Sequence, residues 1–194
     1  MKTPFGIHAE YVSNRAVDNC INMFKKEGRR VKPGVLGEEK VIPEFKDSLD
    51  CSLEVNEISR LKIWHGEMHD IIDNYIRKFP ILKIFEPWGY IEGLNIQYYK
   101  PGGGYRKTHC ERMGKYNGHR LMAFMTYLTD TKNGGTKWNY LDWEAPCKKG
   151  LTLIWPVDYL YTHTGVISNS DDKMIITGWI GYQKPGQSML KTKW

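Results

Sequence analysis

Residues 98–111 read Tyr-Tyr-Lys-Pro-Gly-Gly-Gly-Tyr-Arg-Lys-Thr-His-Cys-Glu, a glycine-rich turn that leads into the pair His109 and Glu111. If residues 105–110 form a strand, alternation places both side chains on one face and turns Cys110 away. A second piece of the chain, His163-Thr164-Gly165-Val166, supplies another imidazole. His109, Glu111 and His163 then form a two-histidine, one-carboxylate set, which can hold a ferrous ion and leave neighbouring coordination positions open.

The chain holds another His-x-Glu pair, His65 and Glu67, which we do not interpret as metal ligands. The pair lies where apolar residues recur with helical spacing, and residues two apart on a helix do not share a face. His65 and His69 are neighbours on such a helix, but the glutamate is one place away from its position in the His-Glu-x-x-His motif of zinc proteases. These histidines are predicted to be surface or half-buried side chains.

His109 and Glu111 lie within a longer series of motifs that runs from about Leu94 to Tyr182. There the chain resembles the iron- and 2-oxoglutarate-dependent dioxygenases, and among them the prolyl 4-hydroxylase-like branch with its small phage and bacterial forms. The family usually has aspartate where Glu111 stands, and the extra methylene moves the carboxylate. The resemblance rests on Tyr99-x-Pro-Gly, His109-x-Glu111, Tyr127-Leu128, Gly134-Gly135-Thr136, Lys149-Gly150 with Trp155-Pro156, His163-x-Gly165, Lys173 and Trp179.

The resemblance implies that Fe(II) is held by His109, Glu111 and His163, and that 2-oxoglutarate and O2 take the open positions. Lys173 is then expected to bind the distal carboxylate of 2-oxoglutarate, because a carboxylate in a dry pocket needs a cation. Tyr127 is the expected hydrogen-bonding neighbour of that carboxylate, and Tyr99 is the second candidate.

Alternation in the last predicted strand places Lys173, Ile175, Thr177 and Trp179 on one face. We therefore expect Thr177 and Trp179 to line the pocket for co-substrate or substrate. The alternative is that both side chains only fill space between two sheets.

The resemblance also implies a reaction: 2-oxoglutarate is converted to succinate and CO2 while an unactivated C–H bond is hydroxylated. The expected substrate is a prolyl residue of a peptide or protein, and ascorbate is a candidate reductant. Two alternatives stay open. One is an oxygenase that acts on nucleic acid or a nucleotide, which the basic net charge favours. The other is a non-catalytic jelly-roll binding module.

The bulk composition fits a globular protein of one domain, with 194 residues, 41% hydrophobic residues and a formal charge of +6. No apolar run is long enough for a transmembrane helix, and the first residues lack the apolar core of a signal peptide. The four cysteines are scattered without a Cys-x-x-Cys pair, which favours reduced thiols and a cytoplasmic location.

The predicted fold is mainly β with flanking helices: a double-stranded β-helix, or cupin-like jelly roll, buttressed by N-terminal helices. Residues 1–90 are expected to form the helical support, with a lid within 29–46, residues 91–182 the catalytic core, and residues 183–194 a basic tail. Helices are predicted at 14–26 and 56–78. Strands are predicted at 91–100, 105–110, 120–129, 136–139, 152–155, 161–166 and 173–182.

Overall fold

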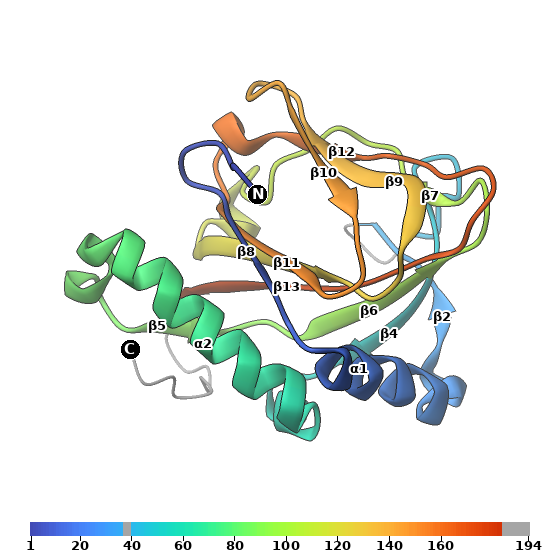
Figure 1. The fold of residues 1–194 in the computed structure, drawn as a ribbon, viewed down its shortest axis with the longest axis horizontal. Coiled ribbons are helices and arrows are strands. Elements are labelled where there is room, and N and C mark those ends of the chain that lie inside the picture. The colour runs from blue at the N-terminus through green and yellow to red at the C-terminus, as the bar shows by residue number, and fades with distance from the viewer. Residues whose placement is uncertain (37–39, 184–194) are drawn as a thin grey trace.

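The computed structural model of the chain describes residues 1–36 and 40–183, in which two antiparallel sheets face each other and two helices cover the outside of the larger one (Figure 1). This arrangement confirms the predicted jelly-roll core. The larger sheet contains, in spatial order, β1 (His8–Tyr11), β11 (Leu151–Pro156), β8 (Arg120–Tyr127), β13 (Lys173–Tyr182), β6 (Leu94–Tyr99), β4 (Leu49–Leu53) and β2 (Lys32–Pro33), while β5 (Trp88–Tyr90) pairs with β13. The smaller sheet contains β10 (Trp143–Cys147), β9 (Thr131–Trp138) and β12 (His163–Gly165), and β3 (Lys46–Asp47) pairs with β7 (Gly104–Tyr105).

Alternation along the central strands divides the interior into two cores. On β8, Phe124 belongs to the core shared with the helices, whereas Met125 belongs to the core between the sheets. On β13, Ile176 and Ile175 alternate in the same way. Because successive strand residues point to opposite faces, one side of β13 is free to line a site while the other side anchors the sheet.

The helices partly confirm the predictions. Helix α1 (Asn14–Lys26) begins where Ser13 accepts the backbone N–H of Ala16 at 3.2 Å. The predicted helix 56–78 is interrupted: a 3-10 helix spans Val55–Arg60, and α2 (Lys62–Lys78) begins after the non-helical Leu61. The start of α2 is capped from α1, where Asn19 Oδ1 accepts the N–H of Ile63 at 3.2 Å.

Replacing Asn19 by alanine is expected to lower the free energy of unfolding by about 1 kcal/mol, because the start of α2 then loses its cap. Chemical denaturation of the variant and the wild type measures this difference. Asn56→Ala is the matched control, since the exposed Asn56 side chain has no described hydrogen bond. Equal losses in the two variants would contradict the capping role.

Several strands differ from the predictions. The strand expected at 105–110 is wrong, because β7 contains only Gly104 and Tyr105, and before β8 the chain forms an isolated bridge at His109 and a 3-10 helix at Lys115–Asn117. Strands β4 and β10 were not expected. Strand β10 contains Pro146, which lacks a backbone N–H, but β10 lies at the edge of the smaller sheet, where proline is tolerated.

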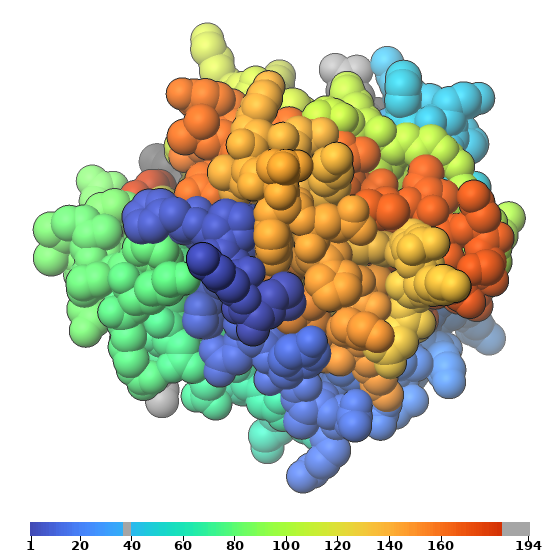
Figure 2. Space-filling view, turned by 45° about the horizontal axis from the view of Figure 1, so that its top comes forward, coloured from blue at the N-terminus to red at the C-terminus, as the bar shows by residue number. Residues whose placement is uncertain are grey.

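The N-terminal segment ties α2 to the opposite side of the molecule, and Figure 2 shows it (dark blue) between α2 (green) and the strands of the smaller sheet (orange). Tyr75 of α2 donates to the carbonyl of Gly6 at 3.0 Å, and Tyr161 donates to that of Phe5 at 3.2 Å. Gly6 has a φ of +84°, and a Cβ there would overlap the Tyr161 hydroxyl.

Two of the predicted regions lie partly outside the described residues. The expected lid at 29–46 includes residues 37–39, and the expected basic tail includes residues 184–194. Within 1–36 and 40–183, no helix is both long enough and apolar enough to cross a membrane.

Candidate metal centre

Two backbone hydrogen bonds bring the histidines of the predicted site together. His109 N–H donates to the carbonyl of His163 at 3.0 Å, and His163 N–H donates to that of His109 at 2.8 Å. The following turn is held by Val157, whose carbonyl accepts the N–H of Glu111 at 3.2 Å. His109 and Glu111 therefore do not alternate along a strand, because His109 forms only a single β-bridge to β12. Their side chains nevertheless point toward His163.

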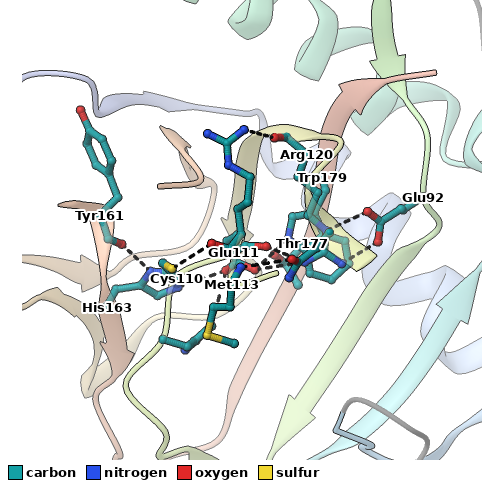
Figure 3. A network of polar contacts seen from close by, with 12 residues as sticks. Glu92, Cys110, Glu111, Met113, Arg120, Tyr161, His163, Thr177 and Trp179 are labelled. Carbon is teal, nitrogen blue, oxygen red and sulfur yellow. Dashed lines mark hydrogen bonds and ion pairs between the residues drawn. The ribbon is translucent and has the colours of Figure 1, made fainter. Parts of the chain in front are cut away.

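The three ligand atoms of His109, Glu111 and His163 lie within 4.8 Å of one another (Figure 3 labels Glu111 and His163). Glu111 Oε1 is 3.2 Å from His163 Nε2 and 3.5 Å from His109 Nε2. The thiol of Cys110 is not part of this group and donates to the carbonyl of Arg112 at 3.4 Å.

The hydrogen bonds of the two imidazoles set their tautomers. His109 Nδ1 lies 2.9 Å from the carbonyl of Lys107, and His163 Nδ1 lies 2.9 Å from that of Tyr161. A carbonyl can only accept, so in the neutral rings the proton is on Nδ1 and a lone pair is on Nε2.

These tautomers leave lone pairs and a carboxylate oxygen facing one another. Burial alone would raise the pKa of Glu111, but hydrogen bonds and charge attraction from His109 and His163, which exist only while a facing Nε2 atom carries a proton, hold it well below its usual range in the metal-free protein. A carboxylate and two neutral imidazoles that converge on one point repel each other unless a cation lies between them. The donor set therefore fits a divalent metal ion, and its mixed nitrogen and oxygen atoms fit Fe(II).

The three side chains open into a cavity of about 440 Å³. This volume is within the range of small-molecule sites, which starts at roughly 300 Å³. The inward face of β13 lines the cavity, and Gly165 on β12 lies close to it. The lining includes Tyr99, Met125, Lys173, Ile175, Thr177 and Trp179.

Lys173 is a buried cation in the wall of this cavity, with 7% of its surface exposed. Its Nζ donates to the carbonyls of Gly134 at 2.9 Å and Val166 at 3.3 Å, and among the described residues no carboxylate pairs with it. Burial lowers the pKa of Lys173 to about 8. An anionic ligand beside the ammonium group would favour its protonated form and raise the pKa of Lys173 again.

The two tyrosines expected near Lys173 are placed differently. Tyr127 is fully buried between the sheets and donates to Thr136 Oγ1 at 2.8 Å, so Thr136 and not Tyr127 reaches the cavity. Tyr99 pairs with Lys173 across β6 and β13, and Lys173 Nζ lies 5.3 Å from the centre of its ring. Tyr99 lines the cavity and Tyr127 does not, but the Tyr99 hydroxyl also has a protein partner, Gln97 Oε1 at 2.6 Å, so the order of the two tyrosines as co-substrate ligands stays a prediction.

Thr177 and Trp179 both line the cavity, but each has a protein partner. Thr177 Oγ1 donates to the carbonyl of Phe124 at 2.8 Å. Trp179 Nε1 donates to Glu111 Oε2 at 2.8 Å, so the indole is attached to the carboxylate of the candidate metal centre (Figure 3). This contact was not expected from the sequence.

Sequence reasoning also missed the charged group that lies on the ring of Trp179. The guanidinium of Arg120 lies 3.8 Å from the centre of the Trp179 ring and pairs with Glu92 at 2.6 Å. His119, with 12% of its side chain exposed, also lies 2.9 Å from Glu92. An arginine at the start of an otherwise apolar strand was the only signal in the sequence.

Comparison with known proteins agrees with this geometry. Residues 94–181 match the sequence model of the 2OG-Fe(II) oxygenase superfamily. No curated protein gave a match.

Several solved structures share the fold. A viral collagen prolyl hydroxylase from Paramecium Bursaria Chlorella virus-1, in complex with 2OG, has a TM-score of 0.63 at 20% identity over 90% of this chain and 95% of its own. A Pseudomonas putida prolyl-4-hydroxylase has a TM-score of 0.68 at 12% identity, with coverage of 92% and 94%. A Trichoplax adhaerens prolyl hydroxylase, in complex with a hypoxia inducible factor peptide fragment, has a TM-score of 0.69 at 12% identity, with coverage of 91% and 83%.

The matched region contains both histidines, Glu111 and Lys173, and it coincides with the jelly-roll core that carries them. Proteins of this superfamily use Fe(II), 2-oxoglutarate and O2, and the donor set described above fits the metal. Residues 94–181 thus carry the sequence features of a 2OG-Fe(II) oxygenase domain, and the chain is a 2-oxoglutarate-dependent dioxygenase.

Proposed function

We propose that His109, Glu111 and His163 hold Fe(II), that Lys173 and Tyr99 bind 2-oxoglutarate, and that the enzyme hydroxylates a prolyl residue of a peptide or protein. One observation carries the proposal: converging metal donors and a buried cation, which no carboxylate of residues 1–36 and 40–183 pairs with, lie in one cavity.

The bound iron and 2-oxoglutarate supply the oxidising chemistry, and succinate and CO2 are released. The protein's own residues supply the geometry. His109 and His163 present their Nε2 lone pairs because the carbonyls of Lys107 and Tyr161 hold the Nδ1 protons.

Lys173 orients 2-oxoglutarate through the distal carboxylate. A Cβ at Gly165 would lie 3.8 Å from Lys173 Nζ, so the ammonium group lies beside β12, two residues along from His163. Met125 and Ile175 also line the cavity, and their apolar side chains keep water away from the co-substrate.

The mouth of the cavity favours a peptide. Val35, Met113 and Tyr116 contribute to its lining and have exposed fractions of 43%, 61% and 96%. Apolar and aromatic side chains exposed around a site are typical of surfaces that bind a partner chain, and a prolyl ring offers matching apolar surface. The similarity to solved prolyl hydroxylases supports the same substrate class.

A nucleic-acid substrate receives less support from the charges near the mouth. Arg120 pairs with Glu92, and Arg112 donates to Asp158 at 3.1 Å. Arginines whose charge is neutralised by carboxylates contribute little to phosphate binding.

The test is succinate release by the Fe(II)-loaded enzyme with ascorbate and three candidate substrates. These are a proline-rich peptide, a matched peptide with alanine at every proline, and a single-stranded oligonucleotide. We expect stimulation by the proline-rich peptide alone, with a mass gain of one oxygen atom on proline. Oxidation of the oligonucleotide, or no turnover despite metal binding, would overturn the proposal.

A further inference from the structure

The candidate metal centre has a glutamate where an aspartate would be shorter by one methylene. A glutamate can reach a metal ion with both carboxylate oxygens, as bidentate carboxylate ligands do. Together with two histidines, a bidentate Glu111 would fill four of the six positions of an octahedral ion. Only two positions would then remain, whereas a chelating 2-oxo acid and O2 need three.

The two carboxylate oxygens of Glu111 have different contacts (Figure 3). Oε1 faces the imidazoles, at 3.2 Å from His163 Nε2 and 3.5 Å from His109 Nε2. Oε2 accepts the indole N–H of Trp179 at 2.8 Å and lies 3.7 Å from Arg120 Nη1. One oxygen is therefore available to the metal and the other is already bound.

Trp179 is itself fixed on both sides. Its backbone belongs to β13, and the guanidinium of Arg120 stacks on its ring at 3.8 Å. Arg120 is held by Glu92 through bonds of 2.7 and 2.6 Å, and it donates to the backbone carbonyl of Glu111 at 3.1 Å. Trp179 thus binds Oε2 of Glu111 while Arg120, stacked on Trp179, binds the backbone carbonyl of the same glutamate, and the two contacts restrict rotation of the carboxylate.

We propose that Trp179, supported by Arg120, is a positioning residue that restricts Glu111 to one-oxygen ligation and so keeps three coordination positions open. This inference rests on the proposed function of the metal centre. It also explains how the centre accommodates a glutamate.

The first test counts the open positions with Mn(II) in place of Fe(II), without 2-oxoglutarate. Water fills open positions, and its proton relaxation rate is proportional to the number of metal-bound waters. In Trp179→Phe, which loses the N–H donor, Glu111 becomes bidentate, and the relaxation enhancement by bound Mn(II) should fall by about a third.

The second test measures 2-oxoglutarate binding to the Mn(II)-loaded proteins by titration calorimetry. Trp179→Phe should bind 2-oxoglutarate at least about tenfold more weakly while Mn(II) affinity is kept or increased. In the Glu111→Asp background, the same substitution should have less than about a twofold effect, because the carboxylate is withdrawn by one methylene and no longer reaches the indole N–H of Trp179. This double-mutant cycle separates an action through Glu111 from direct contact of Trp179 with 2-oxoglutarate.

The possible outcomes are distinct. If the wild type does not bind Mn(II), the proposed function fails. If it binds Mn(II) and Trp179→Phe leaves the relaxation enhancement unchanged, the positioning role is wrong. An equal loss of 2-oxoglutarate affinity in both backgrounds would also overturn it, in favour of direct contact.

Discussion

His163→Ala is expected to abolish both metal binding and 2-oxoglutarate turnover. Loss of a partner that only orients a metal ligand typically costs about 10–100-fold in affinity or activity, so loss of the ligand itself should exceed a hundredfold. His163 is more buried than His109, and its ring lies against that of Trp155, with ring centres 5.3 Å apart. No nearby side chain among the described residues offers a replacement imidazole.

The readout that isolates the metal is thermal unfolding with and without Mn(II). A metal present at a hundred times its dissociation constant stabilises the folded state by about 2.7 kcal/mol, and this stabilisation should vanish in the variant. His8→Gln serves as control, because His8 pairs with Glu10 on β1 and takes no part in the cavity. A Mn(II)-dependent shift that survives in His163→Ala would refute the assignment of this ligand.

Lys173→Met is expected to abolish 2-oxoglutarate binding while the protein stays folded. The buried ammonium has a pKa lowered to about 8 by desolvation, against an ordinary value of 10.5. Below pH 8 the folded protein therefore carries a charge whose burial costs on the order of 3 kcal/mol. This cost diminishes as the pH rises from 8 toward 10.5, because the folded protein then holds Lys173 neutral. Methionine removes the charge, so the ligand-free variant should be no less stable than the wild type at pH 7.

The same shift gives 2-oxoglutarate binding a defined pH dependence. Only the protonated lysine attracts the carboxylate, so affinity should be constant below pH 8 and fall about tenfold for each pH unit above it. Lys173→Arg keeps its charge throughout this range and should show a flat profile. Calorimetric titration of the Mn(II)-loaded proteins between pH 7 and 9.5 gives both curves. A wild-type profile as flat as that of the arginine variant would rule out Lys173 as the anchoring cation.

Sequence reasoning succeeded where a short stretch is decisive. The bounds of β13 agree with the prediction, because alternation and flanking turn residues specify a strand locally. Helix α1 was predicted with the same bounds, since its N-cap and its apolar spacing are both within the segment.

Sequence reasoning failed where the deciding partner lies elsewhere in the chain. The helix predicted at 56–78 is broken at Leu61, and the cap that starts α2 comes from Asn19 in another helix. The sequence likewise could not show that the hydroxyl of Tyr127 donates to Thr136, a contact that only the packing of β8 against β9 reveals.

The sequence by itself indicated the family through its motifs, and with the family the jelly-roll class and the candidate set His109, Glu111 and His163. Alternation, which is a local property, indicated the inward face of β13. Only the tertiary structure decided that Trp179 binds one oxygen of Glu111 and that Lys173 is without a carboxylate partner in the described part of the chain. These are contacts between residues far apart in sequence, and local spacing carries no information about the distance or direction between such side chains.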